Sequence, residues 1–139
     1  MFLLDTHAWV WSVEGDMKRI GPKARRALER AAARDQIRVS PASVFEVTAL
    51  CLTGRLRFAQ SAEQWIAEAL STPGVRVAEL TVPIAIDAGH IPRTALADPI
   101  DRLLFATARR LDATLLTADQ PMLAYAGDNR GVRAVDASR

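Results

Sequence analysis

Short apolar runs and helical segments alternate along this 139-residue chain, and this alternation restricts its fold more than any other feature. The apolar runs are three to six residues long and rich in Leu, Ile and Val, as is typical of short strands. Strands that alternate with helices form βαβ units, in which helices cover both faces of a parallel sheet. The sequence therefore predicts an α/β fold, with a parallel β-sheet of about five short strands flanked by helices on both faces.

The predicted elements follow one another with short connections. We expect strands at residues 1–4, 37–39, 75–80, 113–116 and 132–135, and helices at 8–14, 22–34, 41–53, 62–70, 83–89, 99–111 and 121–125. Three of these helices begin at a proline that follows a capping residue, and proline is well tolerated at the first helical position. Half of the residues are hydrophobic and no linker divides the chain, so we expect residues 1–139 to form a single domain.

The sequence also indicates in which compartment of the cell the protein occurs. No apolar run approaches the roughly 20 residues of a membrane span, and the start MFLLDTH lacks the basic segment of a signal peptide. The single cysteine, Cys51, excludes an internal disulfide. We therefore expect a cytoplasmic protein without a membrane partner.

Two aspartates follow predicted strands. Asp5 separates the apolar residues of MFLL from those of AWVW, and Asp119 follows the run TLLTA. Burying an unpaired carboxylate is costly, so such a group is normally hydrogen-bonded, paired or bound to metal. Ligands of open parallel sheets bind beyond the carboxyl ends of the strands, where both residues are expected. Each aspartate could equally cap the helix that follows it.

Three further acids occur in predicted helices. Glu46 is the only charged residue from Pro41 through Gly54, and its neighbours on the helix face are small or apolar, which favours a functional role. Asp98 and Asp101 belong to the motif DPID. Asp98 is a good helix cap, and Asp101 suits the first turn of the helix dipole, but this turn also directs Asp101 towards the strand ends.

Asp5, Glu46, Asp101 and Asp119 all map to one edge of the predicted sheet. Clustered carboxylates repel one another unless a cation lies among them, and oxygen ligands of this kind select Mg²⁺ or Mn²⁺. Such ions, held in pairs by carboxylates, cleave phosphodiesters. The hydroxyl groups of Thr6 and Thr117 are candidates to orient these ligands.

Basic residues concentrate elsewhere, since eight of the eighteen lie between Lys18 and Arg38. Five of them recur every three or four residues and would form one stripe on a helix: Arg19, Lys23, Arg26, Arg30 and Arg34. This stripe fits an ordinary solvated helix face as well as a binding surface for RNA or for an acidic protein segment. No aromatic residue lies within it, so base stacking there is not indicated.

Four segments together resemble a known family. LLDTHAWVW, SPASVFEV, DPIDRLLFATA and LLTAD, in this order and spacing, are similar to the motifs of PIN-domain endoribonucleases, and more narrowly to VapC-type toxins of type II toxin–antitoxin modules. The resemblance extends from Phe2 to about Val135. Phe45 and Ile100 stand where this family often has aromatic residues, tryptophan in the first case, and both substitutions keep an apolar side chain.

The resemblance implies a parallel sheet between helices and Mg²⁺- or Mn²⁺-dependent cleavage of RNA, often of structured RNAs. It places the four family acids, catalytic and metal-binding, at Asp5, Glu46, Asp101 and Asp119, with Asp98 as an additional ligand, an indirect contributor or a cap. It also implies a small VapB-like antitoxin as partner, and a homodimer.

Two other functions remain open from the residues alone. A metal-dependent phosphohydrolase could use Asp5 as a nucleophile, although His7 occupies the place where such enzymes usually have a second acid. A non-catalytic binding domain would use the acids only as helix caps. Binding of a divalent metal distinguishes this last alternative from an enzyme.

Overall fold

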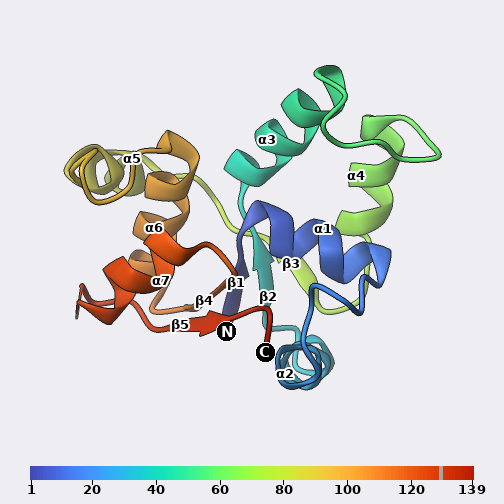
Figure 1. Cartoon of the computed structure of the whole chain (residues 1–139), viewed down its shortest axis with the longest axis horizontal. Helices are drawn as coiled ribbons and strands as arrows, with labels where there is room; N and C mark the ends of the chain where they lie inside the picture. Colours follow the sequence, from blue (N-terminus) through green and yellow to red (C-terminus); the bar gives the residue numbers. More distant parts are fainter. Residues whose placement is uncertain (129) are drawn as a thin grey trace.

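The computed structural model describes residues 1–128 and 130–139, which form a five-stranded parallel sheet with helices on both faces (Figure 1). The strands are β1 (Phe2–Leu4), β2 (Ile37–Val39), β3 (Val75–Val77), β4 (Thr114–Thr117) and β5 (Ala134–Asp136). The helices are α1 (Thr6–Glu14), α2 (Pro22–Ala33), α3 (Pro41–Leu52), α4 (Ala62–Leu70), α5 (Val82–Gly89), α6 (Pro99–Leu111) and α7 (Gln120–Gly127). The predicted fold class is confirmed.

The sheet has the strand order β3-β2-β1-β4-β5, and every neighbouring pair is parallel. The chain winds outward from β1 through β2 and β3 in one direction, and through β4 and β5 in the other. The winding direction therefore reverses between β1 and β4, and ligands of such sheets bind beyond the carboxyl ends of the strands at this reversal. Asp5 directly follows β1, and Asp119 lies two residues beyond β4.

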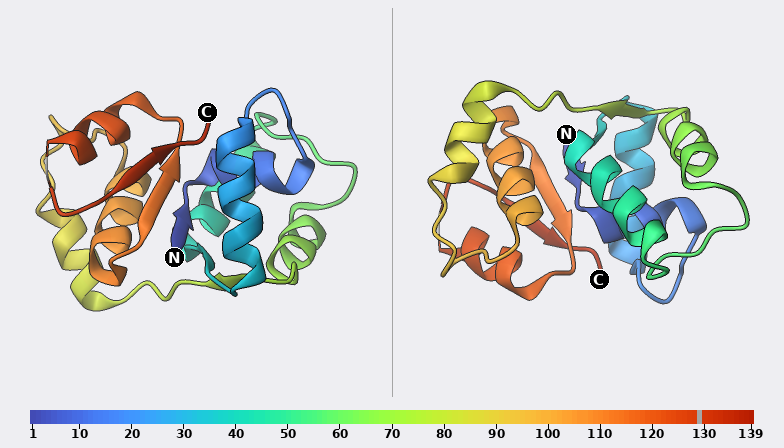
Figure 2. Two further views of the ribbon diagram at one scale, coloured as in Figure 1. Left: turned by 90° about the horizontal axis from the view of Figure 1, so that it is seen from below. Right: turned by 90° about the horizontal axis from the view of Figure 1, so that it is seen from above.

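Two hydrophobic clusters, one on each face of the sheet, hold the helices in place. Leu3 and Leu115 belong to the cluster with α5, α6 and α7, whereas Leu4 and Leu116 belong to the cluster with α1, α2 and α4. Successive residues of a strand point to opposite faces, which explains this division. Figure 2 shows the two helical layers with the sheet between them. None of the helices in the described part of the chain is both long and apolar enough to cross a membrane.

Several boundaries differ from the predicted ones by a few residues. α1 begins at Thr6 instead of residue 8, and α7 begins at Gln120, because Asp5 and Asp119 cap these helices with their carboxylates. β3 is shorter than predicted and ends at Val77. β5 begins two residues later than predicted, because a turn at Gly131, with a φ of 78°, precedes it.

The C-terminal residues close the start of α2. Gly21 precedes this helix and has no side chain to cap it. Instead, the Gly21 N–H donates to the carbonyl of Ala137, and the Lys23 N–H donates to the carbonyl of Arg139, both at 2.9 Å. A Cβ atom on Gly21 would lie 2.2 Å from the carbonyl carbon of Arg139, so this close approach requires glycine.

Candidate active site

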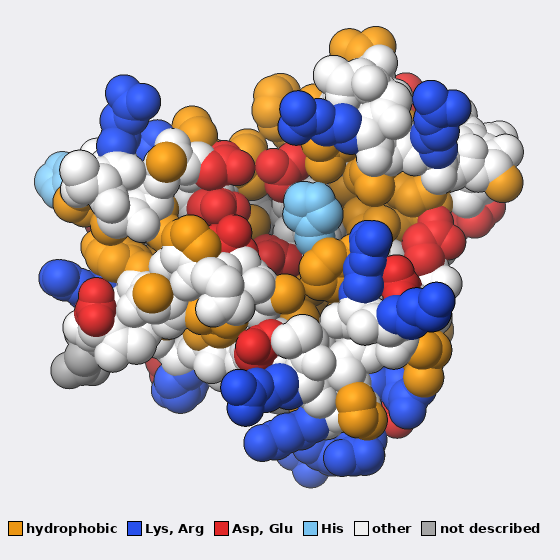
Figure 3. All heavy atoms as spheres, viewed as in Figure 1, with side chains coloured by type: hydrophobic (Ala, Val, Ile, Leu, Met, Phe, Trp, Pro, Cys, Tyr) orange, Lys and Arg blue, Asp and Glu red, His pale blue; other side chains and the backbone are white. Residues whose placement is uncertain are grey.

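Acidic side chains gather in a hollow of the surface between α3 and α6 (Figure 3). They come from the carboxyl ends of β1 and β4, from α3 and from the start of α6, and we call this set the acidic hollow: Asp5, Glu46, Asp98, Asp101 and Asp119. The structure thus brings together all five acids that the sequence singled out.

All the other members of the acidic hollow raise the pKa of Asp101. Its pKa is raised to about 7, first because the half-buried carboxyl group loses contact with water, and then because negative charges surround it. In decreasing order of effect, these charges belong to Asp98, Asp119, Asp5 and Glu46. The site therefore carries an excess of negative charge that a cation would relieve.

Asp5 is the most rigidly held of these carboxylates. It is buried, with 6% of its surface exposed. Its Oδ1 accepts a hydrogen bond from the Ala8 N–H at 2.8 Å, and its Oδ2 accepts one from the hydroxyl of Thr117. Burial raises the pKa of Asp5, although both hydrogen bonds oppose that shift. Since each oxygen has a donor of its own, the orientation of the carboxylate is fixed.

Thr117 joins two of the acids. While its hydroxyl donates to Asp5, the same oxygen accepts a hydrogen bond from the Asp119 N–H at 3.0 Å. Asp119 in turn caps α7, because its Oδ2 accepts from the Met122 N–H at 3.0 Å. The hydroxyl of Thr117 therefore contacts and orients a carboxylate, as the sequence suggested.

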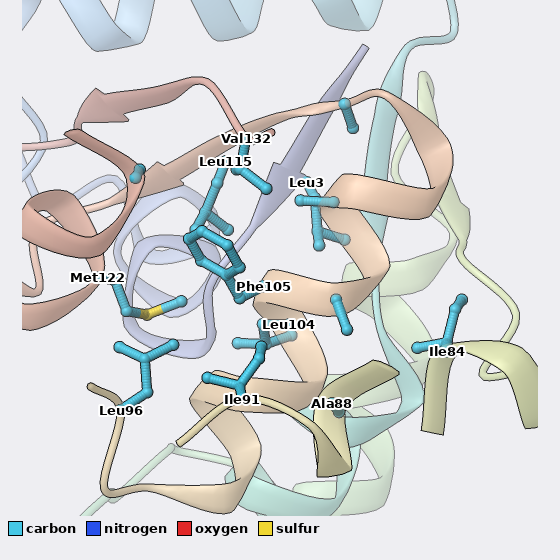
Figure 4. Packing of buried hydrophobic residues seen from close by; sticks show 14 of the residues in the cluster. Leu3, Ile84, Ala88, Ile91, Leu96, Leu104, Phe105, Leu115, Met122 and Val132 are labelled. Atoms are coloured by element: carbon cyan, nitrogen blue, oxygen red, sulfur yellow. The ribbon is translucent and has the colours of Figure 1, made fainter. Parts of the chain in front are cut away.

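The two acids of the DPID motif have different surroundings. Asp98 is exposed and caps α6, since its Oδ1 accepts from the Ile100 N–H at 2.8 Å. Asp101 is half-buried in the first turn. Further along α6, Leu104 and Phe105 are completely buried in the cluster that contains Leu3, Leu115 and Met122 (Figure 4). This packing fixes α6 against the sheet and thereby positions Asp101.

Glu46 is half-buried on α3, as expected from its apolar neighbours. One turn earlier, Ser43 accepts a hydrogen bond of 3.0 Å from the hydroxyl of Thr6, which ties α3 to α1. The hydroxyl of Thr6 is thus hydrogen-bonded to Ser43 and joins the two helices, and its predicted role in orienting a carboxylate stays a prediction. Sequence reasoning did not assign Ser43 a role, since its partner lies 37 residues away and no local pattern signals the bond.

The predicted basic stripe is exposed along α2 and the loop before it, and we call it the basic surface: Arg19, Lys23, Arg26, Arg30 and Arg34. Within residues 1–128 and 130–139, only Arg19 of this set has an acidic partner, Asp16, at 3.7 Å. Figure 3 shows Lys and Arg side chains crowded along the α2 side, apart from the acidic hollow. The basic surface and the acidic hollow thus lie on different parts of the molecule.

The acidic hollow is not a closed metal cage. Among the residues that the structure describes, no three His, Cys, Asp or Glu side chains are arranged so that they could hold a metal ion as they stand. Mutual repulsion between carboxylates favours such spacing. A cation that keeps part of its water shell fits this arrangement better than one that requires a complete set of protein ligands.

Comparisons with known proteins match this architecture along most of the chain. Residues 2–128 match the family described as PIN domain. The chain is 32% identical over 124 residues to Ribonuclease VapC22 of Mycobacterium tuberculosis, an alignment that covers 88% of this chain and 90% of that protein. Two solved structures share the fold. VapBC2 from Rickettsia felis, bound to a DNA fragment from its promoter, has a TM-score of 0.68 at 16% identity, with 97% of each chain covered. DNA-bound VapBC from Salmonella typhimurium has a TM-score of 0.65 at 18% identity, with 97% of this chain and 96% of that one covered.

Proposed function

Because the chain belongs to the PIN domain family, as a ribonuclease of the VapC type, we propose that its acidic hollow is the place where it hydrolyses RNA phosphodiester bonds as the toxin of a toxin–antitoxin pair. One observation carries this assignment: four other carboxylates contribute to raising the pKa of Asp101 to about 7. Strongly shifted pKa values of this kind gather at functional sites. Neither a small-molecule phosphohydrolase nor a non-catalytic domain gains comparable support.

The chemistry of the donor set supports Mg²⁺ or Mn²⁺ as the cofactor. The acidic hollow offers only carboxylate oxygens, which these ions prefer over the nitrogen and sulfur ligands typical of zinc. Mg²⁺ usually keeps several waters and binds through one or two carboxylates together with substrate phosphates, so a complete protein cage is not required. When bound, such an ion activates water and stabilises the charge that develops on the phosphate.

The residues of the chain divide the work of binding and orientation. Asp5, fixed at both oxygens, is the ligand whose position changes least, while Glu46, Asp101 and Asp119 supply further carboxylate oxygens. Thr117 keeps Asp5 and Asp119 in register. Asp98 mainly caps α6 and so orients Asp101.

The substrate is RNA, and we assign its phosphates to the basic surface. Exposed Arg and Lys side chains attract a polyanion, and within the described residues Lys23, Arg26, Arg30 and Arg34 have no acidic partner. Arg in particular suits phosphate geometry. We place the reaction in the cytoplasm, where RNA targets are available.

A small VapB-like antitoxin is the proposed protein partner, and the two solved structures described above are VapBC assemblies. An apolar cavity of about 420 Å³ between α1, α2 and the sheet is available to it, lined among others by Trp9, Ile20 and Leu28. We also propose a homodimer. Exposed apolar side chains on α3 and α5 support it: Phe45, Leu52, Val82 and Ile86.

Metal binding tests the assignment directly. Mg²⁺ or Mn²⁺ should raise the melting temperature of the wild type, because a ligand that binds only the folded state stabilises it by RT ln(1 + [L]/Kd). RNA cleavage should require the same ions and stop in EDTA. Asp5→Asn should abolish the rise in melting temperature while keeping or improving the metal-free stability, since it removes one repelling charge.

Isothermal titration calorimetry measures metal binding to the wild type directly. No metal binding at millimolar concentrations would contradict the nuclease assignment. Arg55→Gln is a matched control, because Arg55 is exposed on the loop between α3 and α4, and its metal response should equal that of the wild type.

A further inference from the structure

Three side chains with flat groups lie in a row along α1 and the loop that follows it, and we call this row the stack. The rings of His7 and Trp11 lie 5.9 Å apart between centroids, tilted by 48°. The guanidinium carbon of Arg19 lies over the ring of Trp11, 5.7 Å from its centroid. The stack therefore runs from an imidazole through an indole to a guanidinium group, three flat groups in succession.

The stack connects the acidic hollow with the basic surface. His7 is exposed in the first turn of α1, two residues after Asp5. Trp11 lies one turn further, about 6 Å along the helix axis. Arg19 is the first member of the basic surface, and 64% of its side chain is exposed. A chain molecule that leaves the acidic hollow along α1 would meet these groups in this order.

Flat aromatic and cationic groups in a row are suited to unpaired nucleotides. RNA bases that are not in a duplex stack on aromatic rings and on guanidinium planes, and cations nearby neutralise the phosphates. Duplex RNA, whose bases are already stacked, cannot use such groups and is bound through its backbone and 2′-hydroxyls. The stack therefore favours a single strand.

We propose that His7, Trp11 and Arg19 bind unpaired nucleotides next to the scissile bond and position the strand in the acidic hollow. This inference rests on the proposed ribonuclease function. An acidic protein segment would pair with Arg19, but it would gain nothing from the aromatic faces of His7 and Trp11, which is why we prefer RNA as the occupant. The three side chains are positioning residues, because they act on the strand and not on the reacting atoms.

Binding of a short single-stranded oligoribonucleotide to variants of the full chain tests this inference. Trp11→Leu should weaken binding by about 5- to 150-fold, the effect of removing one base–aromatic stack. Trp11→Phe should restore most of the affinity, because it keeps an aromatic face. Arg19→Met provides a second test at an exposed position, where the substitution does not disturb the fold. An abasic oligoribonucleotide should bind wild type and Trp11→Leu equally.

The chain offers a matched control on the other side of the sheet. Tyr125 of α7 also carries an arginine over its ring, since the guanidinium carbon of Arg130 lies 5.4 Å from the ring centroid. Tyr125→Leu removes an aromatic–arginine pair of the same kind, away from α1, and should leave RNA binding unchanged. In cleavage assays Trp11→Leu should raise KM by the same factor as Kd and leave kcat close to that of the wild type.

Four outcomes would overturn the inference: unchanged affinity in both Trp11→Leu and Arg19→Met, an equal loss in Tyr125→Leu, an equal loss with the abasic strand, or weaker binding of poly-L-glutamate with unchanged RNA binding. The last result would assign the stack to an acidic protein partner. Failure of the proposed function looks different, because the wild type would then cleave no RNA in Mg²⁺ or Mn²⁺. Normal cleavage with a KM that is independent of Trp11 would reject only the role of the stack.

Discussion

A single hydroxyl group links the central strand to the next strand of the sheet. Thr117, at the end of β4, donates to the carboxylate of Asp5 beyond β1 and accepts from the backbone of Asp119. All three residues are needed in one relative position if Asp5 and Asp119 are to share a ligand. Thr117 thus sets the geometry of the site without belonging to the set of acids.

Thr117→Val tests this role. The substitution leaves a buried oxygen of Asp5 without its donor, which should lower the free energy of unfolding by about 1–3 kcal/mol, as measured by urea denaturation. Loss of an orienting partner typically weakens metal binding by about 10- to 100-fold, and we expect a loss of this size for Mg²⁺. Thr107→Val is the control, because the buried hydroxyl of Thr107 bonds only to the Leu103 carbonyl within α6. Equal effects of the two substitutions on Mg²⁺ affinity would reject the orienting role.

Substitutions of the two aspartates of DPID should differ in their effects on stability and RNA cleavage. Asn can still cap a helix, so Asp98→Asn should cost little stability and keep some cleavage, whereas Asp98→Ala should cost about 1 kcal/mol. Asp101→Asn removes an anionic ligand, and RNA cleavage should fall by orders of magnitude while the fold persists. Cleavage rates and thermal unfolding in matched Mg²⁺ check this. If Asp98→Asn is as inactive as Asp101→Asn, Asp98 also binds the metal.

The metal-free protein should lose stability as the pH rises. The pKa of Asp101 is 3.8 in the reference state and about 7 in the fold, so the folded chain binds this proton more tightly than the unfolded one. The resulting stabilisation is complete below about pH 4 and disappears as the pH passes 7. In EDTA, Asp101→Asn should therefore gain stability relative to the wild type between pH 4 and 7, as measured by urea denaturation at each pH. A constant difference would show that the carboxylates do not interact as described.

The same aspartates both cap helices and lie in the acidic hollow, which explains why single residues could be predicted from local signals. Asp5, Asp98 and Asp119 each cap a helix, as the pattern of aspartate before a helix indicated, and each also lies in the acidic hollow. Strand ends and helix caps are local signals, readable from a few neighbouring residues. The bonds of Thr6 and Thr117 connect residues 37 and 112 positions apart, and no local signal specifies such partners.

At the scale of secondary structure elements, α2 presents its apolar side to the sheet and its cations to solvent. Ala24, Leu28 and Ala31 are buried, whereas Lys23, Arg26 and Arg30 are exposed. Each cation that neutralises a phosphate adds to the affinity for RNA, so neighbouring cations on one helix contribute together. We therefore expect the helix to act as a unit in RNA binding.

Charge reversal on α2 tests this role. Arg26→Glu combined with Arg30→Glu should weaken RNA binding and flatten its dependence on salt, because each lost phosphate contact reduces the number of counterions released. The measurement is Kd at several salt concentrations. Arg55→Glu combined with Arg57→Glu is the control for net charge, since both residues are exposed on the loop between α3 and α4. If the dependence of Kd on salt is unchanged in the α2 variant, the basic surface does not bind RNA and is an ordinary solvated helix face.

Helix positions were predictable because their starts carry chemical signals. Pro22, Pro41 and Pro99 each occupy the first position of a helix, as expected. The ends of short strands carry no comparable signal, which is why β3 and β5 differ from their predicted ranges. Which residues belong to β3 and β5 depends on their pairing with β2 and β4, which come from other segments of the chain.

At the scale of the whole molecule, the fold distributes charged side chains unevenly, which the small net charge does not reveal. The formal net charge is only +2, yet the acidic hollow gathers negative charge beyond the carboxyl ends of β1 and β4, while the basic surface gathers positive charge along α2 (Figure 3). The sequence predicted this separation in outline, since the charges are already segregated along the chain. It did not predict the stack of Trp11 with Arg19, because the folded loop after α1 brings these residues together.

The bond between Thr117 and Asp5 also has a consequence in time. Thr117 leaves the ribosome 112 residues after Asp5. At 5–20 residues per second, this interval lasts roughly 6 to 22 s. Throughout it, the first acid of the hollow lacks the donor that orients it, and Asp101 and Asp119 have yet to be made or are only just emerging. A nascent ribonuclease lies close to the very RNA that encodes it, and we expect the acidic hollow to leave that message uncut during this interval.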